Sequence, residues 1–194
     1  MHELLSVWSN KKGLKLIEAH ALVYALLLIP FNQLQWVVAG IPVRPAAAIP
    51  VVCGILFGPA AAWGLGIGNI AGDLFGSWSL MSIVGFFINM AYPYLAYVLW
   101  HMLVKTREAR PDPYMIFSFW FVTIVVTFLS IVLLAGAGTL FFDRPFESKF
   151  IGYFTNSILL AMLAGTLLFY ALYGWAEKRD WFYGKKWDKE TLIW

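Results

Sequence analysis

Residues 44–76 read RPAAAIPVVCGILFGPAAAWGLGIGNIAGDLFG. Two apolar runs, 45–58 and 60–75, are separated only by Gly58-Pro59, a pair of residues that typically breaks a helix. We therefore expect the two runs to form a tight helical hairpin. Along the second run, a glycine occurs at every fourth position: Gly64, Gly68, Gly72 and Gly76.

The composition of the whole chain places this hairpin in a membrane protein. Of the 194 residues, 61% are hydrophobic and only 13% are charged, whereas soluble domains carry about 25% charged residues. One small soluble core could not bury so many apolar side chains. Cys53 is the only cysteine, which excludes a disulfide scaffold and a zinc cluster of cysteines.

The fold class expected from the apolar runs is all-α, an integral membrane bundle of six transmembrane helices forming a single domain over residues 1–194. A spanning helix needs about 20 mostly apolar residues, and some of the six runs are only just long enough. The expected spans are 14–30, 45–58, 60–75, 80–104, 114–142 and 150–176.

The basic residues indicate the orientation of these spans. With both termini in the cytoplasm, the inner segments hold 11 of the 14 lysines and arginines, and the outer segments hold Arg44, Arg144 and Lys149. Because cytoplasmic loops carry the excess of basic residues, this arrangement is favoured, and an odd number of spans is not. The net charge of +3 is thus explained by orientation in a cell membrane rather than by nucleic-acid binding.

The two ends of the chain lie outside the spans. Residues 1–13 contain Leu4, Leu5 and Trp8 at helical spacing and lack a signal-peptide pattern, so we expect a short interfacial helix. Residues 177–194 are expected to form a cytoplasmic tail.

Small residues mark the faces where helices approach closely. The glycine face of 60–75 has two interpretations: packing within the hairpin, or a smooth surface for a partner subunit. A pair of alanines four residues apart on the first span has the same two interpretations. The candidate partner-interface residues are Ala21, Ala25, Gly64, Gly68 and Gly72.

Polar side chains at membrane depth are the candidates for a binding site. Asp73 either caps structure near the outer border or lines a polar cavity, and Arg44 could pair with it. Asn89 and Asn156 are the deepest amides and either clasp helices together or contact a ligand. Aromatic rings could add flat walls to a pocket. The candidate substrate-binding residues are Trp36, Arg44, Asp73, Trp78, Asn89, Tyr92, Tyr153 and Asn156.

The sequence lacks the motifs of common catalytic sites. It contains no GxSxG, HExxH or Walker A pattern, and the three histidines are not spaced to bind one metal ion. We therefore expect no enzyme activity, no metal site and no cofactor.

The segments 44–50, 53–59 (CGILFGP) and 68–73 (GNIAGD) resemble the substrate-binding S components of energy-coupling factor (ECF) transporters. The chain length, the six expected spans and the pair Ala21 and Ala25 are similar too. In that family the alanine pair lies on the surface that meets the transmembrane scaffold subunit. The resemblance identifies the class of protein rather than the substrate, because S components for different vitamins share little sequence.

The resemblance implies a binding subunit that captures a vitamin or other small-molecule micronutrient from outside. Two ATPase subunits and the scaffold subunit would then drive its release. The pocket would lie in the outer halves of the last three spans, beneath the first outer loop. Three alternatives remain: a solitary cobalamin-type transporter resembling S components, a structural or assembly membrane protein, and a membrane-embedded enzyme. A thiolate at Cys53 would suit cobalt ligation, but its apolar span favours a packed, inert thiol.

Overall fold

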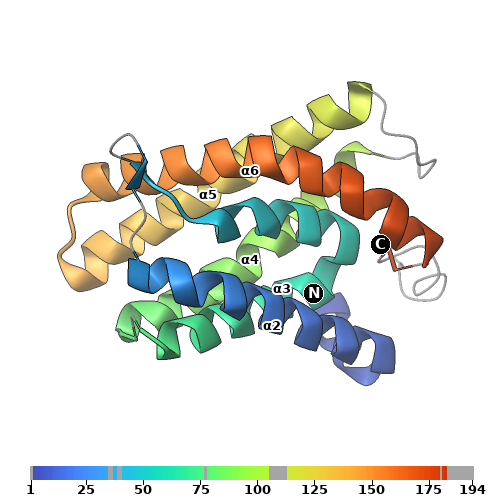
Figure 1. The fold of residues 1–194 in the computed structure, drawn as a ribbon, viewed down its shortest axis with the longest axis horizontal. Coiled ribbons are helices and arrows are strands. Elements are labelled where there is room, and N and C mark those ends of the chain that lie inside the picture. The colour runs from blue at the N-terminus through green and yellow to red at the C-terminus, as the bar shows by residue number, and fades with distance from the viewer. Residues whose placement is uncertain are drawn as a thin grey trace.

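The computed structural model shows a bundle of long helices (Figure 1). It describes residues 2–34, 37–38, 41–76, 78–104, 113–179 and 181–182. The elements in chain order are α1 (His2–Ser6), the 3-10 helix η1 (Val7–Ser9), α2 (Lys11–Leu34), β1 (Val37–Val38), β2 (Ile41–Pro42), the 3-10 helix η2 (Pro45–Ala48), α3 (Ile49–Leu74), α4 (Leu80–Leu103), α5 (Pro113–Phe142) and α6 (Phe146–Lys178).

The predicted all-α class is confirmed, with one small addition. β1 and β2 pair as an antiparallel ribbon of two residues each, between α2 and η2. Among the described residues, five stretches are long and apolar enough to cross a membrane, as in a multi-pass membrane protein. The six expected spans are not confirmed, because residues 45–74 form one such stretch rather than two.

Helix α3 changes direction at Gly58. The backbone there is non-helical, with φ 51° and ψ −128°, a conformation that only glycine adopts without strain. Pro59, which cannot donate a backbone hydrogen bond, begins the next helical segment. The bend divides α3 into a first arm, 49–57, and a second arm, 59–74. Nine helical residues rise only about 14 Å, so the first arm alone is too short to cross a bilayer core of about 30 Å.

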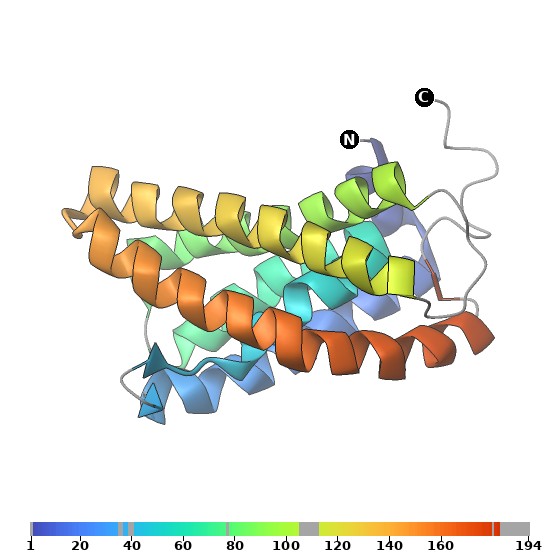
Figure 2. The same ribbon diagram turned by 90° about the horizontal axis from the view of Figure 1, so that it is seen from above.

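Both arms of α3 have their far ends at one end of the bundle, because Arg44 and Asp73 line the same cavity. The chain between them therefore enters and leaves as the predicted hairpin. The stretch that contains α3 is also the most enclosed of the five: 83% of its most apolar part is buried, against 22–44% for the other four. It lies between α5 and α6 on one side and α2 and α4 on the other (Figure 1). Figure 2 shows α5 and α6 diverging away from their connection, with α3 visible between them.

The glycine face of the second arm packs against α2. A Cβ atom on Gly68 would lie 2.7 Å from the Ala21 carbonyl oxygen and 2.9 Å from Tyr24 Cβ. Gly64 meets α2 earlier in the helix, and Gly72 meets it later, so the two elements run parallel. These three candidate partner-interface glycines are buried inside the chain, as in the hairpin-packing interpretation, although the contact is with α2 rather than the first arm.

Of the candidate alanines on α2, Ala21 lies in the same contact, and Ala25 is buried within the chain. Ala21 faces Gly64 and Gly68, and Ala25 is only 8% exposed. The outward face of α2 instead carries larger residues, among them Leu22 and Leu26, which are 60% and 59% exposed.

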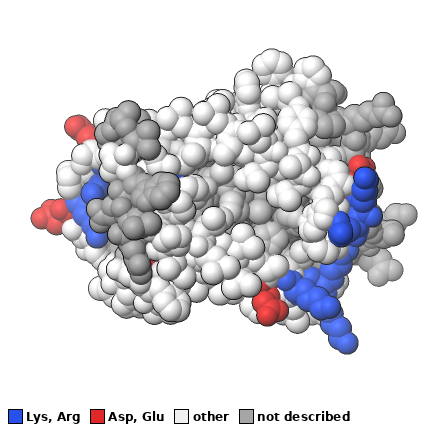
Figure 3. Space-filling view, viewed as in Figure 1, with Lys and Arg blue, Asp and Glu red and all other residues white. Residues whose placement is uncertain are grey.

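The two ends of the bundle are charged and the middle is not. We call the end with α1, the start of α2 and the finish of α6 the terminal end, and the opposite end the pocket end. Figure 3 shows blue and red side chains at both ends and an uncharged belt between them. Among the described residues, five cations lie at the terminal end and three at the pocket end: Lys11, Lys12, Lys15, Lys178 and Arg179, and then Arg44, Arg144 and Lys149.

The N-terminal segment is docked on the terminal end. Trp63 Nε1 donates a hydrogen bond of 2.7 Å to the Leu4 carbonyl oxygen. The rings of Trp8 and Trp63 meet edge to face with centroids 5.3 Å apart. The expected short N-terminal helix is thus present as α1, while Leu5 and Trp8 keep large apolar surfaces exposed.

Substitution of Gly68 tests the close contact between α2 and α3. We expect Gly68→Ala to lower the thermal unfolding midpoint in detergent, because the added methyl group meets backbone atoms of α2. Such overpacking costs about 1–3 kcal/mol. The control is Gly136→Ala on α5, where a Cβ would have no atom within 4 Å; it should be neutral or stabilising. Equal effects of the two changes would contradict this packing.

Candidate functional site

A cavity of about 500 Å³ lies at the pocket end. This volume is within the range of about 300–1,000 Å³ typical of small-molecule sites. Every long helix contributes to it, as do the three connections at this end, α2 to α3, α3 to α4 and α5 to α6. Its apolar lining includes Leu28, Phe31, Val37, Val43, Met81 and Leu134, and its polar lining consists of Arg44, Asn69, Asp73, Ser79, Ser82, Asn89, Arg144, Lys149 and Tyr153.

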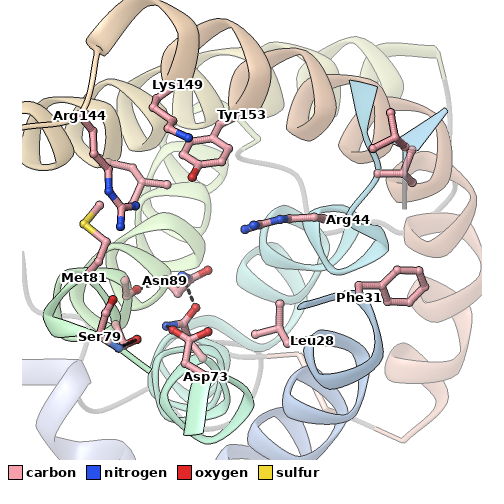
Figure 4. Close-up of a pocket in the computed structure, with 16 residues that line it drawn as sticks. Leu28, Phe31, Arg44, Asp73, Ser79, Met81, Asn89, Arg144, Lys149 and Tyr153 are labelled. Atoms are coloured by element: carbon pink, nitrogen blue, oxygen red, sulfur yellow. Dashed lines mark hydrogen bonds between the residues drawn. The ribbon is translucent and has the colours of Figure 1, made fainter. Parts of the chain in front are cut away.

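One wall of the cavity is a hydrogen-bonded network that joins three helices. Tyr24 on α2 donates to Asn89 Oδ1 on α4 at 2.7 Å, and Asn89 Nδ2 donates to Asn69 Oδ1 on α3 at 3.0 Å. Asn69 Nδ2 in turn donates to Asp73 Oδ2 at 3.2 Å. The sequence argument that Asn89 needs a partner at membrane depth is therefore met within the chain. The same bonds orient Asn69 and Asp73 along the cavity wall, where Figure 4 shows Asp73 close to Asn89.

Gly85 makes room for this network. A Cβ atom at Gly85 would lie 2.8 Å from Asn69 Nδ2, so a larger residue would displace the amide. The Gly85 carbonyl oxygen also accepts a second hydrogen bond from Asn89 Nδ2, at 2.9 Å. Both amide hydrogens of Asn89 are thereby used. Sequence reasoning missed Tyr24 and Gly85, although the spacing of Asn69 and Asp73 by one helical turn was a signal for part of the network.

A second wall carries Arg44, whose position depends on α6. The Arg44 backbone N–H donates to Asn156 Oδ1 at 3.0 Å, and the guanidinium lies 5.6 Å from the centre of the Tyr153 ring. Asn156 is itself only 5% exposed. It therefore fixes the segment before η2 against α6 and directs the Arg44 side chain over Tyr153 toward the cavity (Figure 4).

Two further cations come from the connection between α5 and α6 and from the first turn of α6. The Arg144 backbone N–H donates to the Gly138 carbonyl at 3.1 Å, and its own carbonyl oxygen accepts from Thr139 Oγ1 at 2.8 Å. These bonds fold the connection back over the end of α5. Arg144 and Lys149 both line the cavity. Sequence reasoning assigned them to the outer side but gave them no role in a site.

The structure brings together four of the eight candidate substrate-binding residues: Arg44, Asp73, Asn89 and Tyr153. Three others are not among the cavity's lining residues. Trp78 is 53% exposed at the surface. Asn156 accepts a hydrogen bond from the Arg44 backbone N–H and so holds Arg44 in position. Tyr92 is 5% exposed, and its hydroxyl is 2.6 Å from Thr127 Oγ1, a contact that joins α4 to α5. Trp36 lies outside the described residues.

Cys53 is buried in the first arm of α3 and does not line the cavity. In the part of the chain that the structure describes, no three His, Cys, Asp or Glu side chains gather as a metal site. The described residues therefore give the cavity cationic groups, amides, hydroxyls, one carboxylate and apolar surface.

Comparisons with known proteins add no relative: no protein-family model, curated protein or solved structure matches the chain.

The hydrogen-bonded wall is tested by Tyr24→Phe. Tyr24 is 5% exposed, so loss of its hydroxyl removes the bond to Asn89 without changing the packing. We expect a loss of about 1 kcal/mol of stability, measured as a lower thermal unfolding midpoint in detergent. Tyr170→Phe on α6 is the control, since the Tyr170 hydroxyl bonds to no other described residue. Equal midpoints for the two variants would show that the network does not stabilise the fold.

Proposed function

We propose that the protein is a membrane-embedded substrate-binding subunit for uptake of a vitamin or related micronutrient. It would act as the S component of an ECF transporter, together with a scaffold subunit and two ATPase subunits. The observation that supports binding is the cavity itself, where apolar surface and polar groups from several helices converge at one end of an apolar bundle. The assignment to the ECF class comes from the sequence resemblance of 44–76.

In this proposal the pocket end faces the outside and both termini are cytoplasmic. Helices α2, α4, α5 and α6 each cross once, and α3 enters and returns through the pocket end. Six crossings would place the termini on the same side in the same way. Five of the eight described cations lie at the terminal end, as expected for a cytoplasmic face.

The scaffold subunit would meet α2, as the resemblance implies for the face around Ala21 and Ala25. Because the structure packs Ala25 inward, the contact would involve the neighbouring exposed residues Leu22 and Leu26.

Ligand binding is tested by filling the cavity. Leu134 lines it, whereas its neighbour Leu133 is 56% exposed on the outside of α5. Native mass spectrometry of the purified protein should detect a small molecule carried over from the cell. We expect Leu134→Trp to lose that molecule and Leu133→Trp to retain it, with both variants monodisperse by size-exclusion chromatography. A wild-type protein without any bound molecule would favour the alternative, a structural or assembly membrane protein.

The orientation is tested by reporter fusions. A cytoplasm-active reporter at the C-terminus should be active, and one that works only outside the membrane should be inactive. The same pair of reporters inserted after Asp143, at the pocket end, should give the reverse result. An external C-terminus would contradict the orientation and, with it, the resemblance.

A further inference from the structure

The charges lining the cavity do not balance. Among its described lining residues, three are cations, Arg44, Arg144 and Lys149, and one is a carboxylate, Asp73. Asp73 also receives a hydrogen bond from Asn69. The lining therefore carries an excess of two positive charges within about 500 Å³.

Nearby acidic residues do not enter the cavity to correct this imbalance. Asp143 and Glu147 are close in sequence to Arg144 and Lys149, but both are exposed and neither lines the cavity. In Figure 4, Arg144 and Lys149 lie on one side, and Arg44 extends toward the same space from another. Asp73 and Asn89 lie on the opposite side. The cations thus converge from two segments that are about 100 residues apart, Arg44 before η2 and the pair Arg144 and Lys149 at the start of α6.

Lys149 also lies where a cation is electrostatically unfavourable. It is in the first turn of α6, which begins at Phe146. The N-terminal end of a helix has a partial positive charge and favours anions. The partial positive charge of this helix end and the three cationic side chains therefore act in the same direction, and a bound anion would interact favourably with both.

We propose that the ligand of this cavity carries a negative charge, as an organic carboxylate or a phosphate ester. Arg44, Arg144 and Lys149 hold its anionic group through charge-assisted hydrogen bonds. The uncharged part of the molecule lies toward Asn89, Asn69 and Asp73, with apolar contact to Leu28 and Phe31. This inference rests on the proposed function, since it names the class of substrate for the same site.

The test compares probes that differ only in the anionic group. The pairs are nicotinate and nicotinamide, pantothenate and panthenol, thiamine phosphate and thiamine, and riboflavin phosphate and riboflavin. Affinities for the purified protein are measured by calorimetric titration, alongside identification of any carried-over molecule by native mass spectrometry. We expect the anionic member of at least one pair to bind about tenfold more tightly, or more, because a hydrogen bond to a charged group strengthens binding by this order. The carboxylate pairs and the phosphate pairs distinguish the two sources of charge.

Variants that remove one positive charge each show which residues cause the preference for the anion. Arg144→Gln and Lys149→Gln should each reduce the preference for the anion by about tenfold, with little change in affinity for the neutral member. Arg44→Gln should do the same, since its backbone bond to Asn156 does not involve the side chain. Lys178→Gln, exposed at the terminal end, is the matched control and should leave the preference unchanged.

The outcomes separate this inference from the proposed function. Preferred binding of a neutral or cationic molecule, lost in Leu134→Trp, would overturn the anionic ligand and leave the binding function standing. An anion preference that persists in all three cavity variants would also overturn it. If no probe binds and no molecule is carried over, both proposals fail.

Discussion

The close contact between α2 and the second arm of α3 is the constraint on which the rest of the structure depends. Its glycines bring the two backbones so near that a Cβ on Gly68 would fall 2.7 Å from a carbonyl oxygen of α2. Apolar burial gives little preference for one helix contact over another in lipid, so close packing supplies the specificity. The positive φ of Gly58 makes this arrangement possible, because it lets α3 return to the end from which it entered.

The contact also determines where the polar groups lie. Asn69 and Asp73 follow Gly68 on the same arm, so fixing the glycine face against α2 fixes these side chains toward α4. Tyr24 and Asn89 then complete a network across three helices. In a bilayer, an amide without a partner is costly, so the network strongly favours one register of these helices. The packing of the α3 glycines against α2 thereby determines the position of a polar wall at one end of the bundle.

The sequence predicted much of this fold because its signals were local. Composition and apolar runs gave the all-α membrane class, and Gly58-Pro59 gave the hairpin. The number of full-length spans was not predictable in the same way. The run 45–58 is apolar, as a span is, but in the structure it forms only η2 and the short first arm of α3. The site was predicted in part. Arg44, Asp73, Asn89 and Tyr153 share a cavity, but the partnership of Asn156 with an Arg44 backbone N–H depends on a contact across 112 residues that no local pattern encodes.

The three cations were visible in the sequence only as outer-side charges, because their convergence is a property of the fold. Like charges that line one cavity repel one another and lower stability, and Asp73 is the one described carboxylate in the lining that offsets them. Groups that stabilise a fold are usually satisfied within it, as Asn89 is, and groups left unbalanced are typical of sites that complete their interactions with a ligand. The contrast within one cavity divides its lining by role. The hydrogen-bonded amides hold the helices in place. The three cations are left to interact with the negatively charged ligand that we propose.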